Sequence, residues 1–395
     1  MPDESNVTCF YCGLDKPRSE FSDEHIWPDA LGGDYLPRFW RTDEVCAKCN
    51  SMSGVFVDGT FIRGWAGSAE RGHSAQEYLS LTEPLRTALP LNYFGRSTDP
   101  NIHPDEVADW WVGPCGATIV HFRPKETEAL WSPYLGGDPR AKKARVGRAY
   151  IALASATEFW ILAALGSFKQ HFKRAKRYTV NIVPLPEWTA FEPIDRADPA
   201  QAADLKIFDA ITAAAKAAES VHAQQEIQLD TGHRFLCKLG LALGCQLFGA
   251  SFGTHEHGEQ LRRAFRDPDF QRRQKIPIRG TGYFNGSQQT PLERFGWPGA
   301  WVLMLQTAGA SLSFVVITPS KRSMTIQITD DPALLATLPE GYAEGQVWVT
   351  LPILGQAAGP IATPDYIAHL TGEILNSDLA ALAAARIDPA LLPSC

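Results

Sequence analysis

The chain has 395 residues, of which 45% are hydrophobic and 21% charged, and its net charge at pH 7 is −7. This length predicts two or three structural units rather than one hydrophobic core, and the composition excludes an intrinsically disordered chain. The acidic balance argues against capture of nucleic acid by the surface as a whole, although a local basic groove is compatible with it.

The sequence predicts neither a targeting signal nor a membrane span. The first residues, MPDESNV, contain no basic and no apolar stretch, so a secretory signal is not expected. The most apolar stretch, 235–252, is interrupted by Lys238 and Gln246, which indicates a buried helix. We therefore expect a cytoplasmic protein without membrane contact, in which the eight cysteines are thiols or metal ligands rather than disulfides.

Cysteine spacing and hydrophobic pattern divide the chain into three expected ranges. The first, 1–75, contains four of the eight cysteines and ends in a small-residue segment. The second, 76–195, is expected to be a mixed α/β segment. It would contain a hairpin over 108–123, a helix over 149–177 that ends in the basic run KQHFKRAKR, and a strand over 179–184.

The third range, 196–395, is expected to contain a helical hairpin, an antiparallel sheet and a closing helix. The two helices of the hairpin cover 200–225 and 233–249, and the closing helix covers 364–385. Alternating apolar residues separated by turn residues predict the strands 301–307, 312–318, 324–328 and 346–351. The expected fold class is α+β, with a small metal-bound domain in front of a larger mixed domain.

Two CxxC pairs, Cys9 with Cys12 and Cys46 with Cys49, lie in the first range. Each pair can direct two thiolates at one ion, so together they supply the four sulfurs of a tetrahedral structural Zn²⁺ site. The 33 residues between Cys12 and Cys46 leave room for a β-hairpin. The metal would supply much of the folding energy of this segment, because the segment has little core of its own.

A second motif lies between the two pairs. It reads DEHIWPDALGG over 23–33, and Asn50 directly follows the second pair. The order CxxC, EHIxPxALGG and CxxCN, over about residues 9–58, resembles the zinc-ribbon branch of the HNH endonucleases, which have the ββα-metal fold. By this resemblance His25 is the general base that activates water, and Glu24 and Asn50 are ligands of a catalytic Mg²⁺ or Mn²⁺. These residue types suit the chemistry, because imidazole titrates near neutrality and carboxylate and amide oxygens are hard ligands.

Two positions depart from the family pattern. Glu24 replaces the commoner Asp, and Arg41 stands where the family has its middle Asn, with Thr42 and Asp43 beside it. Asp43 is therefore a candidate to orient the base. Neighbouring residues on a regular strand face opposite ways, so Glu24 and His25 can share a site only where the strand ends or bulges.

Asp58 is a further candidate ligand. In a straight helix it would lie ~12 Å along the axis from Asn50, so sharing one ion would require a break at Gly54. A capping or salt-bridge role fits this spacing better.

Positive charge is concentrated in two parts of this acidic chain. The first combines 142–148 with the basic run, whose candidates for contact with the nucleic-acid backbone are Lys169, Lys173, Arg174, Lys176 and Arg177. The second comprises Arg262, Arg263, Arg266, Arg272, Arg273, Lys275 and Arg279. Each could instead be a solvated helix face, and the nuclease motif favours phosphate contact by the first.

Together these patterns predict a metal-dependent endonuclease that cuts DNA with one divalent cation, in a setting such as bacterial defence against phage or plasmid DNA. One alternative is a non-catalytic zinc-ribbon protein that binds nucleic acid or a partner, which the replacement of the middle Asn favours. Another is a nuclease gated by a ligand bound to the C-terminal domain. The sequence does not determine the strandedness of the nucleic acid or the oligomeric state.

Overall fold

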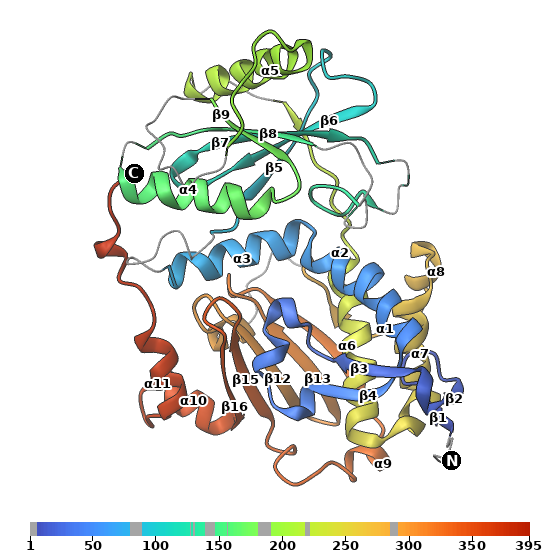
Figure 1. Ribbon diagram of the computed structural model, residues 1–395. Coiled ribbons are helices and arrows are strands. Elements are labelled where there is room, and N and C mark those ends of the chain that lie inside the picture. Colours follow the sequence, from blue (N-terminus) through green and yellow to red (C-terminus); the bar gives the residue numbers. More distant parts are fainter. Residues whose placement is uncertain are drawn as a thin grey trace. The chain divides into compact units, whose positions relative to one another are not determined.

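Two compact units make up the chain in the computed structural model (Figure 1). The structure describes residues 6–79, 89–126, 128, 131–138, 147–155, 157–180, 191–217, 222–284 and 291–395. Unit 1 combines residues 1–62 with 228–386, and unit 2 combines residues 63–227 with 387–395. These units cut across the three expected ranges, because the N-terminal segment packs with the C-terminal sheet. The boundary expected near residue 75 falls inside helix α3 (Trp65–Glu77).

The core of unit 1 is a six-stranded antiparallel sheet in the order β11-β14-β13-β12-β15-β16. Its strands are β11 (Gly280–Thr281), β12 (Trp301–Ala308), β13 (Ser311–Ile317), β14 (Ser323–Thr329), β15 (Gln346–Leu351) and β16 (Gln356–Ala362). The four strands expected from alternation are confirmed. The alternation did not indicate β16, whose sequence QAAGPIA contains few β-forming residues.

Helices cover this sheet. The apolar stretch forms α6 (Thr231–Phe248), which packs on β14 and is buried as expected. The closing helix expected over 364–385 is two helices, α10 (Thr363–Thr371) and α11 (Ser377–Ala384), because Gly372 adopts a left-handed conformation (φ 80°) that ends the first. The remaining helices are α7 (Glu256–Arg266), α8 (Phe270–Arg273) and α9 (Pro332–Leu335).

The N-terminal segment has the element order of a ββα unit. Strand β3 (Phe21–His25) pairs antiparallel with β4 (Arg41–Cys46), and α1 (Ala47–Ser53) follows directly. The hairpin is preceded by β1 (Asn6–Thr8) and β2 (Asp15–Pro17), and α1 is continued by a π-helical turn (Gly54–Asp58) and α2 (Gly59–Ile62).

Buried tryptophans attach this segment to the sheet of unit 1. The ring centroid of Trp27 lies 5.6 Å from that of Trp301, and the centroid of Trp40 lies 5.1 Å from that of Trp348. All four side chains are at most 1% exposed. Burial of a large apolar side chain contributes roughly 1.5–3 kcal/mol, so the segment shares a hydrophobic core with the sheet and does not depend on metal binding alone.

Unit 2 is a six-stranded sheet with a helix on each face. The strand order is β10-β5-β6-β7-β8-β9, and every pair is antiparallel except β8 with β9. The strands are β5 (Asn92–Ser97), β6 (Glu106–Val112), β7 (Thr118–Pro124), β8 (Arg148–Ala152), β9 (Lys176–Thr179) and β10 (Ala223–Gln224). Helix α4 (Glu158–His171) covers the face that contains Ile119, and α5 (Pro199–Lys216) covers the face that contains Val120. Successive strand residues point to opposite faces, which explains this division.

Sequence expectations for unit 2 are confirmed in part. The hairpin over 108–123 is β6 and β7. The prediction of a helix over 149–177 is wrong at both ends. The first residues of this range belong to strand β8 and the last to strand β9, and α4 covers only the part between the two strands. Helix α5 begins as expected, where the Asp198 side chain accepts a hydrogen bond from the backbone N–H of Ala200. It ends at Lys216 rather than near 225. Of the strand expected over 179–184, residues 181–184 lie outside the described residues.

Cys115 and Cys395 form a disulfide within unit 2. This corrects the expectation that all eight cysteines are thiols or metal ligands. The two residues are 280 positions apart, so spacing could not indicate the pair. In the part of the chain that the structure describes, no helix is long and apolar enough to cross a membrane.

Candidate functional site

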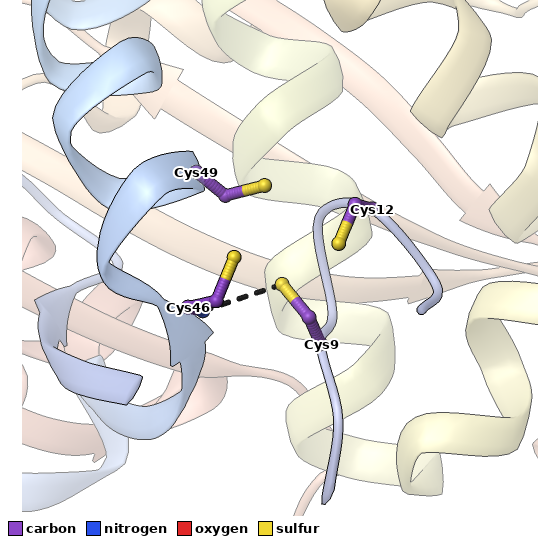
Figure 2. Close-up of side chains that lie close together, drawn as sticks. All are labelled: Cys9, Cys12, Cys46 and Cys49. Carbon is purple, nitrogen blue, oxygen red and sulfur yellow. Dashed lines mark hydrogen bonds between the residues drawn. The ribbon is translucent and has the colours of Figure 1, made fainter. Parts of the chain in front are cut away.

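The sulfur atoms of the four expected zinc ligands, Cys9, Cys12, Cys46 and Cys49, converge in unit 1 (Figure 2). All lie within 4.8 Å of one another. Sulfurs placed tetrahedrally around one ion at about 2.3 Å would be about 3.8 Å apart, so the cluster has the size of a zinc site. The two CxxC pairs come from different places: one from the loop after β1, the other from the end of β4 and the first turn of α1. The expected clustering of the four cysteines is confirmed.

Helix α7 supports the first cysteine pair. The Arg262 guanidinium donates a hydrogen bond to the carbonyl oxygen of Phe10 at 3.2 Å, and that of Arg266 donates to the carbonyl of Tyr11 at 3.0 Å. Arg266 Nη1 also lies 4.0 Å from Cys49 Sγ. Both arginines belong to the second basic cluster. Their guanidinium groups bind the backbone of the loop that contains Cys9 and Cys12, so these two residues are not part of a solvated helix face.

Glu24 and His25 end strand β3 and point to different sides of it. The pairing of β3 with β4 shifts register between Ser22 and Glu24, so the bulge that a shared site requires is present. Glu24 is nevertheless buried, at 4% exposed, whereas the His25 side chain is 20% exposed. The structure therefore does not bring these two side chains to one site.

The Glu24 carboxylate belongs to a buried charged cluster. The Lys238 ammonium, on α6, lies 2.8 Å from Glu24 Oε1 and 2.6 Å from Asp58 Oδ2. The Tyr11 hydroxyl donates a further hydrogen bond to Glu24 Oε1 at 2.9 Å. Burial alone would lower the pKa of Lys238, but the two carboxylates together raise it. The Lys238 ammonium thus neutralises the Glu24 carboxylate, which the family motif assigns to the catalytic metal ion.

His25 instead lies between two aspartates. Its Nδ1 is 3.0 Å from Asp29 Oδ1 and its Nε2 is 3.1 Å from Asp34 Oδ1. Both aspartate side chains are about half exposed, at 53% and 54%. The three residues form a second group that can hold a metal ion, with ligand atoms within 4.8 Å of one another.

The ALGG motif explains how the loop returns to His25. Gly32 adopts a left-handed conformation (φ 96°), and a Cβ on it would lie 2.1 Å from Thr350 Oγ1. A Cβ on Gly33 would lie 1.9 Å from the carbonyl oxygen of Trp27. The turn therefore requires both glycines, and it places Asp29 and Asp34 on opposite sides of one imidazole.

Arg41, at the position of the family's middle Asn, contacts the same site. It is the register partner of His25 across the hairpin. Its guanidinium donates a hydrogen bond to Asp34 Oδ1 at 2.9 Å. Asp43, the alternative candidate to orient the base, is instead paired with Arg18.

The side chains of the other candidate ligands make contacts of their own. The Asn50 side-chain amide donates hydrogen bonds to Ser22 Oγ at 3.1 Å and to the carbonyl oxygen of Asp23 at 2.9 Å, which ties α1 to β3. Asp58 is buried and ion-paired with Lys238, which is the salt-bridge role that its spacing favoured. Burial raises the pKa of Asp58 to about 6, although Lys238 opposes this shift.

The expected nucleic-acid contacts fall in unit 2. Of the first basic group, residues 142–146 lie outside the described residues, and Arg148 is ion-paired with Glu106 and Asp204. In the basic run, Lys173, Arg174 and Lys176 are exposed. The Arg177 guanidinium donates to the carbonyl oxygen of Lys169 at 3.0 Å.

Comparison with known proteins supports the family resemblance of the N-terminal segment. Residues 9–66 match the family model described as HNH endonuclease. No curated protein and no solved structure shows a significant match to the chain. The matched segment contains both CxxC pairs and the Glu24–His25 motif, so the resemblance indicated by the sequence is confirmed. The match suggests a nuclease-type function with nucleic acid as the substrate.

Sequence reasoning missed three residues of this site. Asp29 and Asp34 lie within or beside the quoted motif, but only the fold of the glycine turn shows that they flank His25. In the sequence, Lys238 only interrupts an apolar stretch. A lysine in an otherwise buried helix is rare unless it is paired, and that was the available signal for a carboxylate partner.

Proposed function

We propose that the N-terminal segment is a metal-dependent endonuclease that hydrolyses phosphodiester bonds in DNA, with His25 as the general base. The observation that carries the proposal is the position of the His25 imidazole between two half-exposed carboxylates within the HNH-like segment. A base must reach the proton of an attacking water, and a partly exposed imidazole meets that requirement.

We further propose that Asp29 and Asp34 hold the catalytic Mg²⁺ or Mn²⁺. Carboxylate oxygens are preferred ligands of these ions. Partial burial raises the pKa of Asp29, His25 opposes this shift, and the nearby Asp34 carboxylate adds to it, so the two carboxylates lie close enough to repel each other. A cation bound between them would relieve this repulsion. A divalent cation supplies the positive charge that stabilises a phosphodiester transition state. Arg41 would hold Asp34 in place, and His25 would take the proton.

The competing assignment follows the family motif and uses Glu24 and Asn50 as cation ligands. It requires Lys238 to leave Glu24, because one carboxylate oxygen already contacts both the ammonium and the Tyr11 hydroxyl. The zinc ion of the four-cysteine cluster would be structural in either case, since four thiolates leave no open coordination position.

The test is metal-dependent nicking of supercoiled plasmid by the purified full chain in Mg²⁺, Mn²⁺ or EDTA. The wild-type protein should nick the plasmid only with added metal. His25→Ala should abolish nicking and keep the zinc content, and His103→Ala should behave as wild type because His103 is exposed in unit 2. An inactive wild-type protein that still binds DNA would favour the non-catalytic zinc-ribbon alternative.

The setting is part of the same proposal. We propose a cytoplasmic enzyme that acts on phage or plasmid DNA, supported by resemblance to modular bacterial nucleases. The gated-nuclease alternative would show as nicking that begins only when a small molecule is added to otherwise inactive protein.

A further inference from the structure

Unit 2 contains a pocket that the nuclease proposal does not use. Its volume is about 640 Å³, within the range of small-molecule sites. It lies between the start of α3, the beginning of β5 and the end of α4. The lining residues are Arg63, Ser68, Arg71, Leu89, Pro90, Leu91, Trp111, Leu135, Ser167, Gln170, His171 and Lys173.

Among the residues that the structure describes, three cations line this pocket and no acidic residue does. They are Arg63, just before α3, Arg71 on α3, and Lys173, just after α4. Among the described residues none of the three has an ion-pair partner. By contrast, Arg96 in the same unit is paired with Asp109 and Glu126. Uncompensated positive charge in a concave site attracts anions.

Two of these cations, Arg63 and Arg71, lie close enough to repel each other. Water reaches the Arg71 side chain, but surrounding protein atoms lower its pKa, and Arg63 lowers it further. Water also reaches the neighbouring His171 side chain, but the protein atoms around its imidazole, together with Arg71, lower its pKa to about 4. A bound anion would relieve the repulsion between Arg63 and Arg71.

Trp111 belongs to the apolar part of the pocket wall. Trp111 is 1% exposed, and its indole N–H has no hydrogen-bond acceptor among the residues that the structure describes. The His171 ring lies against it, with centroids 4.5 Å apart. The pocket thus combines two guanidinium groups and an ammonium with an apolar and aromatic wall.

We propose that this pocket binds a phosphate-bearing small molecule of nucleotide size, with its phosphate oxygens held by Arg63, Arg71 and Lys173. Guanidinium groups bind phosphate oxygens in pairs, and three cations match an anion of more than one charge. The volume beyond the phosphates accommodates a ring system against the apolar wall. The site is separate from the His25 site, so it stands whether or not the chain is a nuclease.

The test is titration calorimetry of the full chain with pyrophosphate, ADP and adenosine at fixed ionic strength. We expect one pyrophosphate or ADP bound per chain and no binding of adenosine alone. Tighter binding of ADP than of pyrophosphate would identify a nucleotide-like ligand, and equal binding would identify the phosphate groups alone as the recognised part. Arg63→Gln with Arg71→Gln should weaken binding about tenfold or more, which corresponds to about 1.4 kcal/mol. Arg196→Gln, which removes one exposed arginine elsewhere in unit 2, is the control.

Thermal unfolding distinguishes a ligand site from a structural role. Because the two arginines repel each other, the double variant should keep or raise the Tm. The proposal is overturned if neither pyrophosphate nor ADP binds saturably, or if the double variant binds both as tightly as the wild type. It is also overturned if the double variant loses only affinity for duplex DNA, because the cations would then belong to a nucleic-acid surface.

Discussion

The ammonium of Lys238 lies 2.8 Å from the carboxylate of Glu24, and both groups are buried in unit 1. Lys238 belongs to the helix α6 that packs on the C-terminal sheet, whereas Glu24 belongs to the HNH-like hairpin. The pair therefore links the hairpin to the rest of unit 1 by charge, beside the tryptophan contacts that link them by packing. It also gives the hairpin's own carboxylate a counter-ion within the chain.

Lys238→Met should destabilise unit 1 strongly. The substitution leaves Glu24 and Asp58 buried without a counter-ion, and breaking a buried pair in this way costs about 3–5 kcal/mol. Urea unfolding followed by tryptophan fluorescence measures the loss. Lys275→Met, which removes an exposed lysine, is the control and should change stability by less than about 0.5 kcal/mol. Adding Glu24→Gln to Lys238→Met should restore part of the loss. Equal stability of the two lysine variants would contradict the structural role of Lys238.

Zinc should be bound at about one ion per chain, and its removal should loosen the N-terminal segment. Cys49→Ser should lower the zinc content measured by atomic emission and lower the Tm, because the metal links the loop after β1 to α1. Cys237→Ala removes a buried thiol outside the cluster and should keep the zinc. The segment should stay attached to the sheet through Trp27 and Trp40, so the loss should be partial. Full zinc content in Cys49→Ser would contradict the four-cysteine site.

The residues that could be predicted from sequence are those whose signal is local. Paired CxxC spacing identified the cysteine cluster, and alternation identified four strands of the unit 1 sheet. The counter-ion of Glu24 could not be predicted, because Lys238 lies far along the chain and its position depends on how α6 packs. The helix predicted from residue 149 onward is wrong at its start for a similar reason, since the pairing of β8 with β7 and β9 is set by tertiary structure.

Acid should destabilise unit 2 through His121. Burial lowers the pKa of this imidazole from 6.5 to about 3, against the attraction of Asp109 and with added repulsion from Arg123, His171 and Arg148. Below pH 6.5 His121 is protonated in the unfolded chain but stays neutral in the folded chain. The contribution of the neutral imidazole to the free energy of unfolding is therefore complete above pH 6.5. It is lost as the pH falls toward 3, by at most about 1.4 kcal/mol per pH unit.

The measurement is urea unfolding between pH 7 and pH 4. His121→Phe should give a shallower dependence on pH than the wild type, because it removes the titrating group and keeps a ring at that position. His103→Ala, which removes an exposed imidazole, should keep the wild-type slope. Parallel slopes for the wild type and His121→Phe would show that other groups cause the acid sensitivity.

The basic run should contribute to nucleic-acid affinity without sequence preference. Arg174 and Lys176 are exposed and do not line the phosphate pocket, so they test the run separately. Arg174→Glu with Lys176→Glu should weaken DNA binding and reduce the slope of log K against log salt by about 1 for each lost phosphate contact. Arg196→Glu, which makes the same kind of charge reversal at one exposed position elsewhere in unit 2, is the control. An unchanged slope would show that the run is a solvated helix end, and the Arg262–Arg279 cluster would be tested next.

The assignment of the catalytic cation can be decided by comparing two sets of carboxylate variants. Asp29→Asn with Asp34→Asn removes both charges beside His25 and should lower Mg²⁺- or Mn²⁺-dependent nicking roughly hundredfold or more, since a cation contributes several kcal/mol to such a transition state. Both side chains are half exposed, so the Tm and zinc content should change little. Glu24→Gln should have the opposite profile. It leaves Lys238 with Asp58 as its remaining carboxylate partner, so it should lower the Tm while nicking persists below the unfolding transition. Manganese binding measured by electron paramagnetic resonance supplies the readout independent of activity: the aspartate variant should bind less Mn²⁺, and the Glu24 variant should bind as the wild type does. The reverse pattern, with cation binding lost in Glu24→Gln and kept in the aspartate pair, would mean that Lys238 leaves Glu24 in the active enzyme and that the family's ligands hold the metal.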